Sequence, residues 1–147
     1  MSVGKVLFIC FHNSARSQMA EGMLNFFAGE RYKARSAGTE PSSINPMAIR
    51  VMREIGIDIS GHRAKGLDEF AGSKFDLVVT VCDAGKEACP FFPGARELMH
   101  RSFADPSGAQ GTESERLEVF RLVRDQIREW LNETFAMESA TGRSGTP

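Results

Sequence analysis

The sequence lacks a surplus of either charge. Its 147 residues hold 18 Lys and Arg against 19 Asp and Glu, which gives a formal net charge of −1. No global positive field therefore draws the chain to nucleic acid or to an anionic membrane, and we expect neither as a partner. A binding site for an anion has to be built locally.

Long apolar runs are also missing. No stretch approaches the roughly 20 residues that a transmembrane helix needs. The opening MSVGKVLFIC contains one lysine, a short apolar stretch and no small-residue cleavage site, so it predicts a strand rather than a signal peptide. We expect a cytoplasmic monomer with a single domain over residues 1–137, followed by a small, polar, disordered tail over 138–147.

Cysteine is scarce, with only Cys10, Cys82 and Cys89 present. An odd number of cysteines in a chain without an export signal favours free thiols in a reducing compartment. A structural zinc ion usually takes four ligands, whereas here the histidines are scattered and no C-x-x-C pair occurs. We therefore expect no metal site.

The apolar pattern predicts strands that alternate with helices. Apolar and β-rich runs predict strands in KVLFICF, YKARSAGTEP, FDLVVTVC and ELMHRSF. Apolar residues at helical spacing predict helices between and after them, and GLDEFAG predicts a short one. This alternation predicts an α/β fold, with a four-stranded parallel sheet flanked by helices on both faces.

Local signals mark where two of the helices begin. Asn45 as a cap with Pro46 after it predicts one start, and Thr112 with Glu115 matches a capping box. The predicted buried faces are Met19, Met23, Phe26 and Phe27 in the first helix; Ala48, Met52 and Ile55 in the second; and Leu117, Phe120, Val123, Ile127 and Leu131 in the last.

The stretch CFHNSAR combines a thiol and a guanidinium between a predicted strand and a predicted helix. Backbone N–H groups and the helix dipole at such a junction bind a tetrahedral oxyanion, and Arg16 can grip it with two hydrogen bonds. The same positive field favours thiolate, so we expect a nucleophilic Cys10. A cysteine that only packs in the core is the alternative. The predicted substrate-binding residues are Phe11, His12, Asn13, Ser14, Ala15, Arg16 and Ser17.

Two further reactive residues follow other strands. Ligands of parallel sheets bind at the carboxyl ends of the strands. Because Cys10 and Cys82 end two predicted strands and Asp105 follows a third, we expect the three to share one edge of the sheet. The alternative for Asp105 is that its side chain only stabilises the turn in which it lies.

The spacing of Cys82 and Cys89 suits a moving disulfide. In a helix their Cα atoms would lie about 10 Å apart along the axis, whereas a disulfide needs roughly 7 Å or less. Gly85 and Pro90 make the segment a poor helix, so it can unwind. The spacing favours a redox relay over a static bridge. The alternative is that Cys82 is a small apolar residue at the end of a strand and Cys89 an incidental loop thiol.

CFHNSARSQMAEG resembles the anion loop of the low-molecular-weight tyrosine phosphatase fold, and RSQMAEG resembles its thioredoxin-coupled arsenate reductase branch. The similarity covers about residues 4–135, including SAGTEP, NPMAI, IDISGHRA, DLVVTVC, CPFFPG and FADPSG. It implies that Cys10 attacks arsenate while Arg16 holds the oxyanion. It also implies that oxidation passes to Cys82 and then to Cys89, that thioredoxin reduces the final disulfide, and that Asp105 is a general acid.

Two departures from the family pattern bear on function. Ser107 and Gly108 follow Asp105 where tyrosine phosphatases have tyrosines. Some members bind potassium with residues that match Asn13, Glu21 and Ser36, but GHRAKG here brings Arg63 and Lys65 to that region. Since these cations repel potassium, we expect neither a potassium site nor a tightly bound cofactor.

Arsenate reduction for arsenic detoxification is the predicted function, and phosphate or sulfate would mimic the substrate. A phosphatase for phosphotyrosine or small phosphomonoesters is one alternative, with Cys82 and Cys89 as redox protection. Others are an arsenate–thiol transferase that uses a low-molecular-weight thiol such as mycothiol, a reductase recycled by glutaredoxin, and a non-catalytic oxyanion or thiol sensor.

Overall fold

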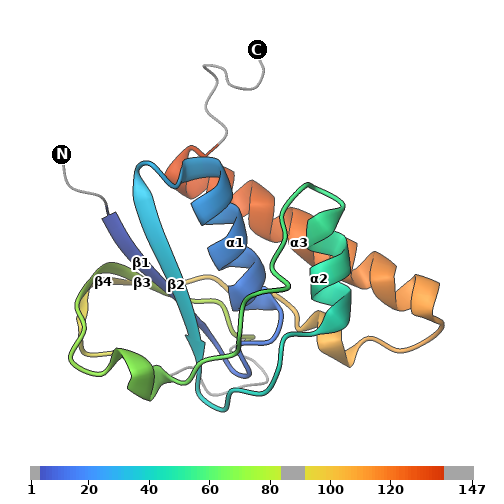
Figure 1. Ribbon diagram of the computed structural model, residues 1–147, viewed down its shortest axis with the longest axis horizontal. Coiled ribbons are helices and arrows are strands. Elements are labelled where there is room, and N and C mark those ends of the chain that lie inside the picture. Colours follow the sequence, from blue (N-terminus) through green and yellow to red (C-terminus); the bar gives the residue numbers. More distant parts are fainter. Residues whose placement is uncertain (1–3, 84–91, 138–147) are drawn as a thin grey trace.

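Figure 1 shows the computed structural model, which describes residues 4–83 and 92–137. Cys89, most of the loop predicted after Cys82, and the predicted tail at 138–147 lie outside the described residues. The elements along the chain are β1 (Gly4–Cys10), α1 (Arg16–Ala28), β2 (Tyr32–Gly38), α2 (Pro46–Arg53), the 3₁₀ helix η1 (Leu67–Phe70), β3 (Phe75–Thr80), β4 (Ala95–His100), the 3₁₀ helix η2 (Pro106–Gly108) and α3 (Glu113–Phe135).

The four strands form one parallel sheet in the order β2-β1-β3-β4. Cys10 pairs with Gly38, Ile9 with Thr80, and Thr80 with His100. The carboxyl ends of all the strands therefore meet at one edge. The predicted four-stranded parallel sheet is confirmed, and this edge is where ligands of such sheets bind.

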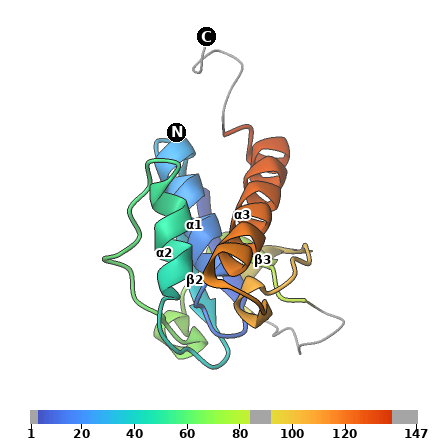
Figure 2. The same ribbon diagram turned by 90° about the vertical axis from the view of Figure 1, so that its right-hand side faces the viewer.

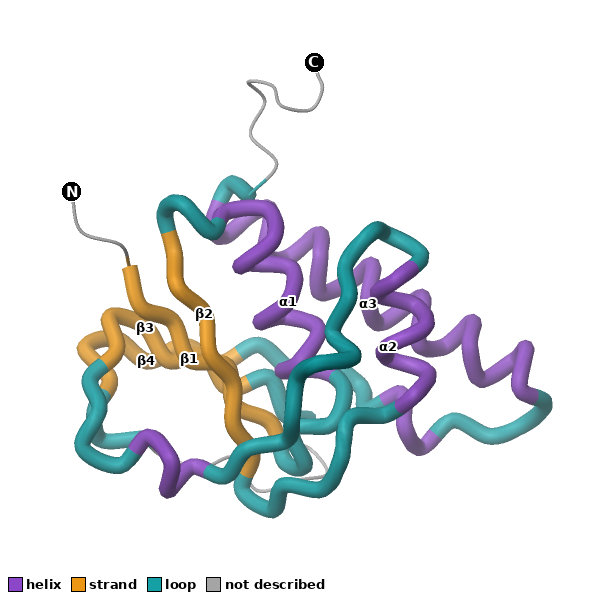
Figure 3. The backbone as a smooth tube through the Cα atoms, in the orientation of Figure 1, coloured by secondary structure: helices purple, strands orange, loops and turns teal. Residues whose placement is uncertain are grey.

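Side chains alternate along β1 and divide the core into two clusters. Val6, Phe8 and Cys10 pack with the buried faces of α1, α2 and α3 in the larger cluster. Leu7 and Ile9 belong to the smaller cluster on the other face, where η1 packs. Figures 2 and 3 show the α-helices gathered on one side of the sheet. Helices lie on both faces, with the shorter cover supplied by η1.

One predicted core residue of α1 is misplaced. Met19 and Met23 are buried, but Phe26 is 57% exposed. Within the described residues its one aromatic partner is the Phe27 ring, in a T-shaped arrangement. In the last turns of α1 the buried apolar residues are Leu24 and Ala28. Phe26 lies two residues after Leu24, about 200° around the helix, so the prediction for Phe26 is wrong.

The predicted helix starts are confirmed. Asn45 Oδ1 accepts a 2.8 Å hydrogen bond from the Met47 backbone N–H, with Pro46 at the first helical position. Thr112 and Glu115 form the capping box of α3. All the apolar residues predicted for the inner face of α3 are buried. Within the part of the chain that the structure describes, no helix is long and apolar enough to cross a membrane.

Candidate active site

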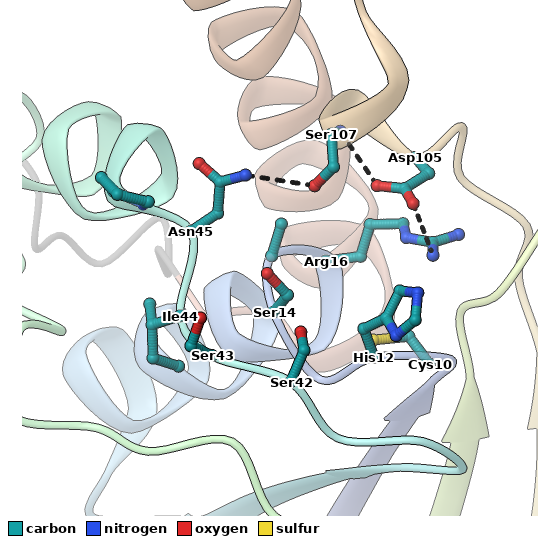
Figure 4. A pocket seen from close by; sticks show the side chains of 12 residues that line it. Cys10, His12, Ser14, Arg16, Ser42, Ser43, Ile44, Asn45, Asp105 and Ser107 are labelled. Carbon is teal, nitrogen blue, oxygen red and sulfur yellow. Dashed lines mark hydrogen bonds and ion pairs between the residues drawn. The ribbon is translucent and has the colours of Figure 1, made fainter.

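A pocket of about 230 Å³ opens at the carboxyl edge of the sheet (Figure 4). Three segments that are far apart in the sequence converge on it. They are the anion loop between β1 and α1, the connection between β2 and α2, and the turn after β4. The lining residues are Cys10, His12, Ser14, Ala15, Arg16, Ser42, Ser43, Ile44, Asn45, Pro46, Asp105 and Ser107.

Asn13 fixes the shape of the anion loop. It is fully buried and has a φ of 53°, in the left-handed region that asparagine tolerates. Its Oδ1 accepts hydrogen bonds from Gln18 Nε2 and from the Lys65 backbone N–H, each at 2.8 Å. The loop also packs tightly on Gly38 at the end of β2, where a Cβ atom would lie 2.6 Å from the Phe11 carbonyl oxygen. The backbone thus has little freedom here.

The candidate nucleophile lies against a serine hydroxyl. Cys10 Sγ and Ser17 Oγ are 2.8 Å apart and both are buried. Asn13 Nδ2 donates a 2.8 Å hydrogen bond to Ser17 Oγ. Because that oxygen already accepts a hydrogen bond from the amide, the serine can direct its own O–H at the sulfur. The candidate nucleophile therefore has a hydrogen-bond donor within reach of its sulfur.

Arg16 closes the pocket beside an acid. Arg16 is only 2% exposed, and its Nη2 lies 3.5 Å from Asp105 Oδ2. Its Nη1 donates to the Phe103 carbonyl oxygen at 3.2 Å. Asp105 Oδ1 also accepts a 3.0 Å hydrogen bond from the Ser107 backbone N–H. Asp105 therefore holds its own turn and faces the pocket at the same time.

Cys82 lies at the same edge of the sheet but does not line the pocket. The Val81 backbone N–H donates a 2.8 Å hydrogen bond to the Ile9 carbonyl oxygen, so the chain still runs beside β1 after β3 has ended. Cys82 follows directly and is fully buried. The topology thus brings Cys10, Arg16, Cys82 and Asp105 to one edge, while Cys89 lies outside the described residues.

The histidines have different roles. His12 lines the pocket, and its Nδ1 lies 3.0 Å from the Glu40 carbonyl oxygen. His62 Nδ1 lies 2.9 Å from Gln18 Oε1, and His100 Nδ1 lies 2.7 Å from Thr80 Oγ1, so both rings are held by hydrogen bonds outside the pocket lining. Among the described residues, no group of three or more His, Cys, Asp and Glu side chains could hold a metal ion.

Sequence reasoning missed one wall of the pocket. Ser42 to Pro46 line it from the connection between β2 and α2. A signal was available, because this polar stretch follows a strand whose end lies at the ligand-binding edge. The family resemblance brought Lys65 to the region of Glu21, but no local pattern predicted that the two side chains form an ion pair.

Comparisons with known proteins give the family. Residues 5–140 match the family described as low molecular weight phosphotyrosine protein phosphatase. An arsenate reductase of Halalkalibacterium halodurans is 44% identical over 122 residues, which cover 83% of this chain and 88% of that protein. A solved arsenate reductase in the phosphate binding state superposes with a TM-score of 0.78 at 35% identity and covers 91% of this chain and 98% of its own.

A third similar protein is a thioredoxin-dependent arsenate reductase of Corynebacterium glutamicum. Its structure has a TM-score of 0.64 and 29% identity, and the match covers 91% of this chain and 63% of that one. The family match spans nearly the whole chain, and the similarity extends to the loop, the sheet and the helices. The chain therefore belongs to the low molecular weight phosphotyrosine protein phosphatase family, and within it to the relatives of the arsenate reductases.

Proposed function

We propose that this protein reduces arsenate to arsenite, with Cys10 as the nucleophile. The observation that carries the proposal is the buried Cys10–Ser17 contact in a pocket that Arg16 and the anion loop enclose. The relatives named as arsenate reductases support arsenate as the substrate, for detoxification of arsenic. Phosphate and sulfate, which share its tetrahedral shape, act as mimics.

The first step forms a bond between sulfur and arsenic. The Cys10 thiolate attacks arsenate, and one arsenate oxygen leaves as water after protonation. We assign the supply of that proton to Asp105, which lines the pocket and lies 3.5 Å from Arg16. Arg16 and the loop N–H groups hold the remaining oxygens.

The second step transfers two electrons. In the reduced protein, the Cys82 thiolate attacks Cys10 Sγ, both electrons of the sulfur–arsenic bond pass to arsenic, and arsenite leaves. Cys89 then attacks Cys82 Sγ, which releases Cys10 as a thiolate and leaves a disulfide between Cys82 and Cys89. The position of Cys82 beside the end of β1 supports this order.

A dithiol protein reduces the final disulfide. The thioredoxin dependence of the Corynebacterium glutamicum relative supports thioredoxin in this role. The relay needs reduced thiols, so the reaction belongs in the cytoplasm. Residues 1–137 act as one monomeric domain that needs no tightly bound cofactor, no potassium ion and no nucleic acid.

The variant Cys82→Ser tests the relay. It should abolish multiple-turnover arsenate reduction with thioredoxin and its reductase, because arsenite cannot leave without a second thiol. It should keep hydrolysis of a small aryl phosphate, which needs only Cys10, Arg16 and Asp105. Cys10→Ser is the control and should lose both activities. Unimpaired arsenate turnover by Cys82→Ser would overturn the relay.

Peptide mapping gives a second readout of the same relay. Wild-type protein treated with arsenate, without reductant, should contain a disulfide between Cys82 and Cys89. Three free thiols after that treatment would contradict the proposal. Turnover compared across thioredoxin, glutaredoxin with glutathione, and mycothiol systems then identifies the physiological reductant.

Hydrolysis of small phosphomonoesters is the second candidate. The Arg16–Asp105 pair beside Cys10 is what favours it, because a held oxyanion and an acid suit an ester leaving group. Among the described residues, the pocket lining includes Ser42, Ser43 and Ser107 and no Phe, Tyr or Trp, which favours small esters over phosphotyrosine. The ratio of kcat/KM for arsenate to that for an aryl phosphate decides between the two functions.

A further inference from the structure

A lysine ammonium lies against a nearly buried carboxylate next to the anion loop. Lys65 Nζ is 3.7 Å from Glu21 Oε1, and the two side chains are only 12% and 11% exposed. The same ammonium donates to the Arg63 carbonyl oxygen at 3.2 Å. Glu21 Oε1 also accepts a short hydrogen bond from Ser36 Oγ. A carboxylate so far removed from water requires a compensating cation, and Lys65 supplies one.

Lys65 also holds the anion loop through its main chain. Its N–H donates to Asn13 Oδ1, and its carbonyl oxygen accepts from the Gly38 N–H, both at 2.8 Å. Asn13 is the left-handed residue of the loop, and Gly38 is where the loop packs on β2. One residue thus joins α1 through Glu21, the end of β2, and the anion loop.

These contacts continue to the nucleophile. The amide oxygen of Asn13 accepts a hydrogen bond from the Lys65 main-chain N–H, and its amide nitrogen donates one to Ser17 Oγ. Ser17 Oγ in turn contacts Cys10 Sγ. A shift of Lys65 would therefore turn the Asn13 amide and weaken the hydrogen bond to the thiolate. An unpaired Glu21 would in addition place a negative charge behind a site that binds anions.

We propose that Lys65 is a positioning residue whose ammonium is a built-in cation. It neutralises Glu21 and fixes Asn13, so that the loop binds an oxyanion without help from a dissociable ion. Lys65 itself does not line the pocket. The inference rests on the proposed function only for the identity of the oxyanion that turns over.

Sulfate binding in buffer free of alkali cations tests this inference. Protection of Cys10 from iodoacetamide measures the affinity, and the pH dependence of alkylation reports the thiolate. Lys65→Met should weaken sulfate binding by about tenfold or more, since it breaks a nearly buried ion pair, and should move the onset of alkylation to higher pH. Lys65→Arg keeps the charge and should stay close to wild type. Lys74→Met removes an exposed lysine at the opposite edge of the sheet and should change neither readout.

Two further measurements separate a built-in cation from a lysine that only stabilises the fold. Potassium or methylammonium should restore sulfate binding to Lys65→Met and leave wild type unchanged. The double variant Glu21→Gln with Lys65→Met should recover most of the affinity, because no charge is left unpaired. Wild-type-like sulfate binding by Lys65→Met, or a double variant as weak as the single one, would overturn the inference.

Folding and function have their own controls. If circular dichroism shows that Lys65→Met does not fold, Glu21→Gln replaces it and should bind sulfate at least as tightly as wild type. A tenfold loss in Glu21→Gln would contradict the inference. Arsenate turnover by wild type tests the proposed function separately. If wild type did not turn over arsenate but its sulfate affinity still depended on Lys65, the proposed function would be wrong and the inference about Lys65 would stand.

Discussion

At the residue scale, the amide of Asn13 explains why asparagine occupies that position. The amide oxygen accepts hydrogen bonds from Gln18 and Lys65, and the amide nitrogen donates a hydrogen bond to Ser17. Aspartate would lack the donor, and an aliphatic side chain would lack both functions. Asparagine also tolerates the left-handed backbone found here. One side chain therefore satisfies both the shape of the loop and the orientation of the serine beside the thiol.

Asp105→Asn should separate anion binding from chemistry. The carboxylate competes with an oxyanion for Arg16, from which it lies 3.5 Å away, so its neutral replacement should tighten sulfate binding. The same change removes a proton donor and should slow hydrolysis of an aryl phosphate by about 10²- to 10⁴-fold. Sulfate protection of Cys10 and steady-state kinetics measure the two effects. An unchanged kcat would show that Asp105 only stabilises its turn and takes no part in the reaction.

At the element scale, local signals predicted helix starts well and burial less well. Asn45 with Pro46, and Thr112 with Glu115, cap their helices through neighbours in sequence. Phe26 was misplaced because packing partners, not helical spacing, decide which side of α1 is covered.

The same contrast holds for the candidate site. Cys10, Arg16 and Asp105 could be predicted to converge because parallel strands end at one edge. The pocket wall from Ser42 to Pro46 has no periodic pattern, and Lys65 and Glu21 meet only through the tertiary fold. These features therefore could not be read from spacing.

Glu54 links α2 to α3 and should make stability depend on pH. It caps the end of α2 and binds Arg121 at 2.7 Å and Arg124 at 2.9 Å. The hydrogen bond from Arg121 lowers the pKa of Glu54 below its ordinary value of 4.5. The stabilisation is therefore complete above pH 4.5 and disappears as the pH falls through the lowered pKa of the folded state.

Urea unfolding of Glu54→Gln measures this contribution. The variant should lose about 1 kcal/mol or less at pH 7, as expected for partly exposed ion pairs. The difference from wild type should shrink as the pH is lowered below 4.5, the ordinary pKa of the group. A difference that stays constant over the whole range would mean that charge on Glu54 contributes nothing.

At the scale of the whole molecule, the site depends on the complete sheet edge. The ends of β1 and β2, the start of α1 and the turn after β4 each contribute to it. Both core clusters pack against β1, which leads directly to Cys10. Anion binding should therefore be coupled to global folding.

Sulfate should stabilise the folded protein through Arg16. At a concentration about 100 times its Kd, sulfate should raise the free energy of unfolding of wild type by about 2.7 kcal/mol. Arg16→Ala should lose most of this increment, whatever its own stability. Urea unfolding with and without sulfate, at an ionic strength matched with chloride, measures the increment. Equal increments in the free energy of unfolding of both proteins would mean that sulfate binds at a site that does not involve Arg16.

The close packing of Gly38 on the anion loop limits how the loop can be engineered. A graft of CFHNSAR into another strand–helix junction would carry the thiol and the guanidinium. It would leave behind the glycine that the Phe11 carbonyl oxygen approaches, and the Lys65 main chain that binds both Asn13 and Gly38. A working transplant would have to move the ends of β1 and β2 together with the Lys65 segment, as one unit of design.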